Sequence, residues 1–301
     1  MRSLLICSRH ADGATSFCLL TSPEKDIIIY LRLESQTEGR ALMSRSLKGP
    51  VSDIPWPTFR GTAQLVGATS DGIVTVYVDP SLGAQALKNA QDLIADAPRV
   101  VAANNAIFGT TGGATNVIVY ALGGATDGTG GADHMACNYQ TGNNIEVCAA
   151  FGDSTRVSAL FEAELSECSM NGQLCGLSTG EALSRWCASS TSNNALADFA
   201  TAPAWAQQGA PDFVDTVDQT DQNAVSTGCG MAFISWLLSK GYTLPTIAQK
   251  MVAAGDAGTF AGLYGTLTGD SPGNAWQNFL NAVNALPGGV NSDDPFGGAN
   301  G

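Results

Sequence analysis

The pattern of apolar and polar residues predicts strands in the first half of the chain and helices in the second. The run at 73–78 is rich in β-branched and aromatic residues, and the run at 116–122 is largely apolar, so both are typical of strands. Between them, apolar residues recur at helical spacing from 84 to 108. Pro98 predicts a break or a second helix start in that span, because proline lacks a backbone N–H.

Two further strand signals flank this region. A single strand is indicated at 27–31, and residues 138–147 are interpreted as two short strands joined by a turn at 141–144. A glycine-rich loop at 123–131 precedes this predicted hairpin.

The second half of the chain predicts a series of helices separated by loops, the longest loop being 198–228. The helices are expected at 155–168, from about 179, and at 230–239, 244–254, 259–266 and 275–286. Because strands come first and no alternating βαβ series is visible, the pattern favours an α+β fold over a doubly wound sheet. It predicts a small N-terminal sheet with a hairpin and a helical C-terminal half.

Charge divides the chain into unlike parts. Residues 1–60 carry eight Lys or Arg residues against six acids, whereas the remainder carries six bases against 21 acids. We therefore expect an atypical N-terminal extension or pro-region at 1–54 and a main domain at 55–286. The Gly-, Asn- and Asp-rich segment 287–301 is expected to be a flexible tail.

The acidic balance also limits the classes of partner. A net charge of −13 and an isoelectric point near 4.3 disfavour binding to nucleic acid, whose phosphates the protein would repel. No apolar run approaches the roughly 18–20 residues that span a bilayer, so no membrane partner is expected. The expected partner is a small-molecule, glycan or peptide substrate.

Cysteine usage indicates an oxidising compartment. Six of the eight cysteines lie within residues 137–229, which predicts disulfides and a secreted or periplasmic location. A zinc site is disfavoured because CxxC spacing and nearby histidines are lacking. Fifteen pairings of six cysteines are possible, and proximity favours the set Cys137–Cys148, Cys168–Cys175 and Cys187–Cys229.

The main candidate for chemistry is a carboxylate placed in the apolar face of a helix. That face is formed by Val157, Leu160, Phe161, Leu165 and Cys168. Glu164 falls in the same stripe, and Glu167 lies three residues further on the same flank, whereas Glu162 is expected to point into solvent. A buried carboxylate has to be protonated, hydrogen-bonded, paired or bound to a cation. The alternative to a functional role is a structural ion pair between Glu164 and Arg185 or Arg156.

The segment Ala163-Glu164-Leu165-Ser166-Glu167, followed by Gly180-Glu181-Ala182-Leu183-Ser184, resembles the active-site region of thermolysin-like zincin metallopeptidases. These enzymes carry HExxH on one helix and a third glutamate ligand on the next. The resemblance covers about 155–190 and implies a zincin-like fold, with Glu164 as general base and Glu181 as metal ligand. Ala163 and Glu167 stand where the zinc-binding histidines belong, and the chain has only two histidines, so an ordinary HExxH site is excluded.

The same resemblance implies a role for His134. In zincins the hairpin before the active helix lines the substrate cleft, which would place His134 and the preceding Asp133 near Glu164. His134 is then a candidate for acid–base work or metal ligation. The alternative is an ordinary histidine of a surface loop.

Three functions remain open on these residues. The first is a secreted hydrolase in which Glu164 and Glu167 act as acid and nucleophile or base, helped by His134, Asp133 and Glu181. A glycosidic bond is favoured because the histidine ligands are missing. The second is a metal-dependent peptidase with Glu181, His134 and Glu167 as ligands of Zn²⁺ or Ca²⁺. The third is a non-catalytic binding protein on a zincin scaffold.

Overall fold

The structure is a computed structural model of the 301-residue chain. It describes residues 4–9, 15–21, 29–34, 54–140 and 143–298. The chain divides into two compact units, Met1–Leu47 and Lys48–Gly301.

The first unit contains one antiparallel sheet in the order β1-β2-β3. Its strands are β1 (Leu4–Arg9), β2 (Thr15–Thr21) and β3 (Ile29–Glu34). The sequence predicted a single strand here, at 27–31. β3 overlaps that strand, and residues 27 and 28 lie outside the described residues.

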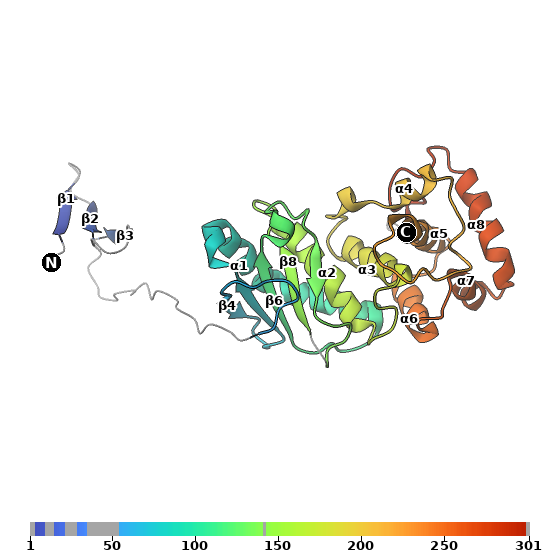
Figure 1. The fold of residues 1–301 in the computed structure, drawn as a ribbon, viewed down its shortest axis with the longest axis horizontal. Coiled ribbons are helices and arrows are strands. Elements are labelled where there is room, and N and C mark those ends of the chain that lie inside the picture. The colour runs from blue at the N-terminus through green and yellow to red at the C-terminus, as the bar shows by residue number, and fades with distance from the viewer. Residues whose placement is uncertain (1–3, 10–14, 22–28, 35–53, 141–142, 299–301) are drawn as a thin grey trace. The chain divides into compact units, whose positions relative to one another are not determined.

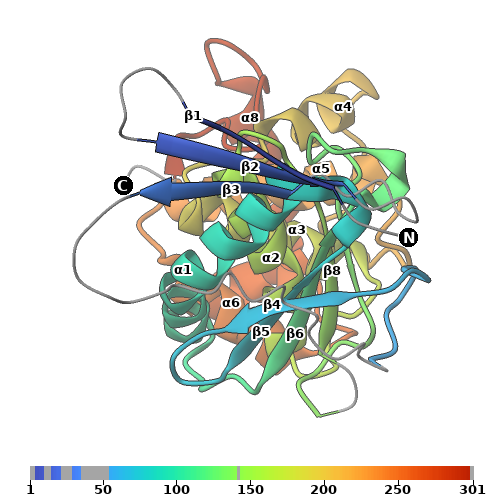
Figure 2. The same cartoon turned by 90° about the vertical axis from the view of Figure 1, so that its left-hand side faces the viewer.

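The second unit contains a five-stranded mixed sheet, which confirms the α+β class with a small sheet. Its strands are β4 (Gln64–Ala68), β5 (Val74–Val78), β6 (Thr115–Tyr120), β7 (Ala132–His134) and β8 (Asn144–Cys148). Their order is β4-β5-β6-β8-β7; β5, β6 and β8 run parallel, and the edge strands β4 and β7 run antiparallel to their neighbours. Figure 2 shows β4, β5, β6 and β8 side by side.

One helix pair covers a face of this sheet. α1 (Gly83–Phe108) and α2 (Ser154–Ser169) pack their apolar side chains on the buried valines of β5 and β6 and on β8. The predicted break at Pro98 is wrong, because α1 is continuous through it. The proline costs one backbone hydrogen bond, but Ala97 and Val100 on either side of it are fully buried in this layer and hold both halves of the helix in line.

The remaining helices form the other half of the unit (Figure 1). They are α3 (Ser178–Thr191), α4 (Ala202–Gln207), α5 (Ala224–Ser239), α6 (Leu244–Ala254), α7 (Phe260–Thr268) and α8 (Ala275–Asn284). Short 3₁₀ turns lie at Pro80–Leu82, Leu122–Gly124, Ala197–Phe199 and Pro272–Asn274. No helix among the described residues has the length and hydrophobicity needed to cross a membrane.

α5 begins six residues earlier than the sequence predicted. The side chain of Asn223 caps it by accepting a hydrogen bond from the backbone of Val225. Gly228 therefore lies inside the helix, where a Cβ would come within 2.2 Å of the carbonyl oxygen of Thr201. This glycine allows close contact between chain segments and does not mark a turn. The predicted loop at 198–228 therefore extended too far, and the predicted helix began too late.

The hairpin before α2 exists, but its first strand lies further upstream than predicted. β7 pairs with β8 in the register His134↔Ile145, so residues 138–140 belong to the connecting loop. Cys137 therefore does not face Cys148, which ends β8 inside the core.

The predicted cysteine pairing is wrong for this reason. The structure contains the disulfide Cys137–Cys175, which joins the loop after β7 to the loop between α2 and α3. The four other cysteines of the second unit are buried and unpaired: Cys148, Cys168, Cys187 and Cys229. The second unit thus contains one disulfide where three were expected, and in it Cys137 pairs with Cys175 and not with Cys148.

The segment after 287, expected to be a flexible tail, makes specific contacts over its described residues. The carboxylate of Asp293 accepts hydrogen bonds from two backbone N–H groups at the start of α4, at 2.7 and 2.8 Å. The ring of Phe296 lies 6.3 Å from that of Phe279 in the helical core.

Glu162 is a second correction to the helix pattern. It was expected in solvent, but it is fully buried, and neither carboxylate oxygen has a hydrogen-bond partner of good geometry. The reason is that α2 packs against α1, α3 and β8, so little of its circumference reaches water. Burial raises the pKa of Glu162 well above its ordinary value, and the positive charge of Arg99 offsets this only in part.

The first prediction follows from this raised pKa. The folded protein retains a proton at Glu162 that the unfolded chain releases above about pH 4.5, so this residue lowers the free energy of unfolding as pH rises. Glu162→Gln should therefore raise the free energy of unfolding by about 1 kcal/mol or more at pH 8, with little change at pH 4. Urea unfolding at both pH values measures this, and a difference that does not depend on pH would show that native Glu162 is ionised.

Candidate functional site

A cavity of about 490 Å³ lies where β7, α2 and α3 meet. Its lining includes all five candidate site residues from the sequence: Asp133, His134, Glu164, Glu167 and Glu181. The glycine loop before β7 forms part of the wall. At Gly130 a Cβ would lie 1.9 Å from the carbonyl oxygen of Leu122, so this close approach of two chain segments requires glycine.

α2 presents two of these carboxylates on one flank. The helix begins after Asp153, whose side chain accepts a hydrogen bond from the backbone of Arg156. Its apolar stripe packs on the sheet, which turns Glu164 and Glu167 toward the cavity. Their side chains are only 14% and 13% exposed, so both acids are largely removed from water while still lining an open space.

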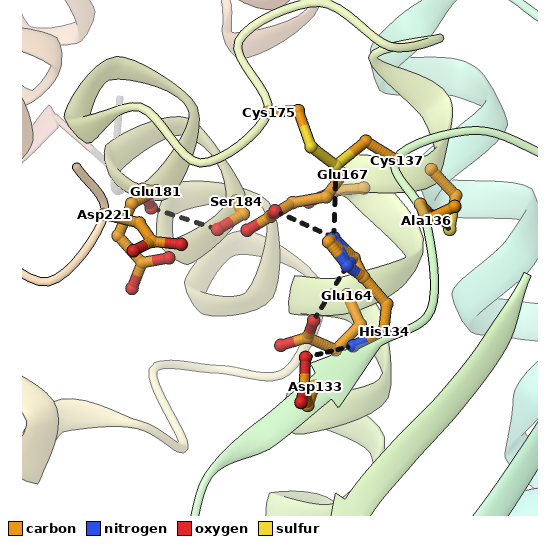
Figure 3. A network of polar contacts seen from close by, with 12 residues as sticks. Asp133, His134, Ala136, Cys137, Glu164, Glu167, Cys175, Glu181, Ser184 and Asp221 are labelled. Carbon is orange, nitrogen blue, oxygen red and sulfur yellow. Dashed lines mark hydrogen bonds and ion pairs between the residues drawn. A yellow bond between two sulfur atoms is a disulfide. The ribbon is translucent and has the colours of Figure 1, made fainter. Parts of the chain in front are cut away.

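The imidazole of His134 lies between these two acids (Figure 3). Its Nε2 is 3.1 Å from Oε2 of Glu167, and its Nδ1 is 3.9 Å from Oε2 of Glu164. The first distance is that of a hydrogen bond, whereas the second lies within ion-pair range only. Glu167 therefore has a hydrogen-bond partner on the ring, and Glu164 does not.

Three interactions hold His134 in this place. Its strand pairs with β8 at Ile145, and its backbone N–H donates to Oδ1 of Asp133 at 2.8 Å. The Sγ atom of Cys137 lies 3.7 Å from Nε2, so the disulfide to Cys175 forms one border of the site. The histidine is 13% exposed and is not a surface-loop residue.

The ion-pair alternative for Glu164 is wrong. Arg185 donates from Nε to Glu181 at 2.6 Å. Arg156 makes two hydrogen bonds to Asp198, at 2.6 and 2.8 Å. Both arginines named as partners are thus engaged elsewhere, and the ion pairs of the described residues give Glu164 only the imidazole.

The pKa values of the two cavity acids, Glu164 and Glu167, differ from those of ordinary glutamates. Burial raises the pKa of Glu164 well above its usual range, and the charges of Glu167 and Glu181 raise it further. Burial also raises the pKa of Glu167, to about 8, with a further increase from Glu181 and an opposing decrease from a hydrogen bond with Ser184. Both acids are therefore shifted toward the protonated form, and only Glu167 has a hydrogen bond that opposes the shift.

The β7 residues are shifted as well. Burial raises the pKa of Asp133, against the effect of the backbone hydrogen bond that it accepts from His134. Burial lowers the pKa of His134, against the raising effect of Asp133 and Asp221. The imidazole is therefore neutral at neutral pH and can donate one hydrogen bond and accept another.

Several cavity residues were not assigned to this site from the sequence. Arg185 was considered only as a partner of Glu164, and Asp221 is one of several acids in a loop. The Cys137–Cys175 disulfide at the border depends on a pairing that sequence proximity did not favour. No local pattern marks these residues, because the fold brings them to the cavity from separate loops and from α3.

The atoms around His134 that could bind a metal ion are few in the disulfide-bonded protein. Among the described residues, one group of three or more candidate ligand atoms lies within 4.8 Å of one another, and it consists of His134, Cys137 and Glu167. The sulfur of Cys137 is in the disulfide and is not a thiolate. The predicted ligand set of His134, Glu167 and Glu181 does not form such a group.

Comparisons of this chain with protein-family models, with curated proteins and with solved structures found no match. The α+β class with its small mixed sheet and the single disulfide of the second unit are therefore established by the structure alone. What the cavity can do follows from its own residues.

Proposed function

We propose that this protein is a hydrolase that uses Glu164 and Glu167 in acid–base catalysis without a metal, with a glycosidic bond as the favoured target. The observation that carries the proposal is the carboxyl group of Glu164, which lines an open cavity and has no arginine or lysine partner. A protein gains no stability from such a group, since burial without a cation opposes ionisation. Its place beside a second acid and a histidine supports a chemical role.

The surroundings of the two acids assign a role to each. Glu164 has no hydrogen bond among the described residues, and burial raises its pKa well above the ordinary value, which suits a general acid. Glu167 shares a hydrogen bond with Nε2 of His134, and a hydrogen bond with Ser184 lowers its pKa, which suits a nucleophile or general base. His134 positions Glu167 through Nε2. Such a division between two nearby carboxyl groups is the pattern of pKa tuning that acid–base enzymes use.

The spacing of the acids favours a glycosidic bond. Residues three apart on a helix have Cβ atoms about 5–6 Å apart, and retaining glycosidases hold their two carboxyl groups about 5–5.5 Å apart. Leu160, Leu196 and Phe199 add an apolar wall, against which a sugar ring can pack. The one arginine of the cavity, Arg185, is paired with Glu181, so the lining has no free cation for an acidic substrate.

The zincin resemblance enters this proposal as a scaffold and not as a zinc site. The position of His134 beside Glu164 supports the layout that the resemblance implies. The missing histidine ligands and the sulfur engaged in the disulfide argue against a metallopeptidase. The disulfide also supports action in an oxidising, extracellular or periplasmic compartment.

The second prediction concerns the substrate class. In a screen of chromogenic glycosides, esters and peptides, the oxidised protein should release product from a glycoside, and a chelator should leave the rate unchanged. Proteolysis that stops on addition of the chelator, together with stoichiometric bound zinc, would replace this proposal with the metallopeptidase alternative.

The third prediction separates catalysis from folding. Glu164→Gln removes the proton donor and should lower kcat/KM by about 10²–10⁴-fold. Glu162→Gln is a matched control, since it makes the same change two residues away on the same helix and points into the core. It should keep wild-type activity. Equal activity in both variants would exclude Glu164 from the chemistry.

The fourth prediction concerns pH. The rate should rise as Glu167 ionises, near pH 8, and fall again where Glu164 loses its proton. His134→Phe retains a flat ring but removes the hydrogen bond to Glu167, which raises the pKa of that acid. The acid limb of the kcat/KM profile should therefore move to higher pH. A limb that stays in place would show that His134 does not position Glu167.

A further inference from the structure

The disulfide at the edge of the cavity conceals one of three atoms with metal-ligand geometry. Sγ of Cys137 lies 3.7 Å from Nε2 of His134, and that nitrogen lies 3.1 Å from Oε2 of Glu167. All three atoms lie within 4.8 Å of one another. They come from the β7–β8 loop, from β7 and from α2, so the fold brings them together and no sequence motif does.

The two separations from Nε2 of His134 are close to those of a tetrahedral zinc site. With Zn–N and Zn–O bonds of about 2.0 Å and a Zn–S bond of about 2.3 Å, tetrahedral angles place N and O about 3.3 Å apart and N and S about 3.5 Å apart. The observed 3.1 and 3.7 Å differ from these values by a few tenths of an ångström. Sγ of Cys137 and Oε2 of Glu167 lie within 4.8 Å of each other, so a zinc ion bound at Nε2 would have to draw these two atoms to about 3.5 Å once the sulfur is free.

The other ring nitrogen of His134 also has a suitable neighbour. Metal-bound histidines commonly direct their second nitrogen toward a carboxylate, which sets the tautomer and the ring orientation. Here Nδ1 faces Oε2 of Glu164 at 3.9 Å. The ring is thus oriented with Nε2 toward the sulfur and Nδ1 toward an acid.

We propose that reduction of Cys137–Cys175 creates a zinc site formed by Cys137, His134 and Glu167, with water as the fourth ligand. Cys175 is exposed and Cys137 is buried, so a dithiol reductant would attack at Cys175. Cys137 leaves as the thiolate when the disulfide breaks. The second thiol of the reductant then displaces Cys175, which takes up a proton, and the reductant becomes a disulfide.

The disulfide and the metal are alternatives in this proposal, since the same sulfur cannot serve both. Zinc would also occupy Oε2 of Glu167 and Nε2 of His134. If the proposed function is correct, the reduced, zinc-bound protein is inactive until the disulfide forms. That consequence depends on the proposed function, whereas the metal site does not.

Two single substitutions test the site without a substrate. Cys175→Ser leaves Cys137 as a free thiol in an otherwise intact site. Cys137→Ser is the matched control, because it breaks the same disulfide and leaves an equivalent free thiol at Cys175. Each variant, and the oxidised wild-type protein, is titrated with Co²⁺, whose thiolate complexes absorb in the near ultraviolet and whose tetrahedral complexes absorb strongly in the visible.

We expect Cys175→Ser to show both absorption bands at one equivalent of cobalt and to bind it at least tenfold more tightly than Cys137→Ser. Oxidised wild-type protein should show neither band, and wild-type protein treated with a phosphine reductant should gain both. Equal binding by the two variants would show that Cys137 is not the ligand. Absence of the bands from Cys175→Ser and from the reduced wild-type protein, when circular dichroism shows both to be folded, would also overturn the proposal.

Discussion

Removal of carboxylates from water is the constraint on which the site in this structure depends. Three buried glutamates on neighbouring elements meet it in different ways. Glu146 on β8 accepts hydrogen bonds from the backbone of Thr58 and Phe59, so its carboxyl group has donors where it lies. Glu162 has no such donors of good geometry, and burial raises its pKa well above the ordinary value. Glu164 is also short of donors but lines an open cavity, so its proton can be exchanged with a ligand. Of these three acids, only Glu164 is placed where a ligand could reach its carboxyl group.

The composition of the chain explains why the cavity acids lack cations. After residue 60 there are only six Lys and Arg residues for 21 acids. Four of the six form ion pairs outside the pair of cavity acids: Lys88 with Asp92, Arg99 with Asp96, Arg156 with Asp198, and Arg185 with Glu181. The Arg156 pair holds α2 to the segment before α4, so loss of that arginine to Glu164 would cost a structural contact. The neutral imidazole of His134 is the partner that remains.

Periodicity in the sequence was sufficient for the strongly patterned elements and insufficient for the short ones and for the contacts between elements. The helices at 84–108 and 155–168 and the strands at 73–78 and 116–122 were predicted within two residues, since each has a strong apolar pattern. Glu164 was found for the same reason, because it interrupts an apolar stripe. Glu162 was misplaced because a pattern on one face of a helix does not reveal that α1 and α3 cover the others. The disulfide was misassigned because a three-residue edge strand carries almost no signal, and its position decides where Cys137 lies.

The Cys137–Cys175 disulfide joins the stability of this region to its chemistry. It closes a loop of about 38 residues that contains β8 and α2, for which the loss of chain entropy in the unfolded state corresponds to about 4 kcal/mol. The same bond holds the β7–β8 loop close to α2, so it keeps His134 beside Glu167. It also withholds a thiolate from a position where two other candidate ligand atoms, from His134 and Glu167, already meet. A pair of cysteines used for stability alone could lie anywhere in these two loops. This pair instead places the sulfur of Cys137 against the imidazole, which is the contact on which the proposed redox dependence of the site rests.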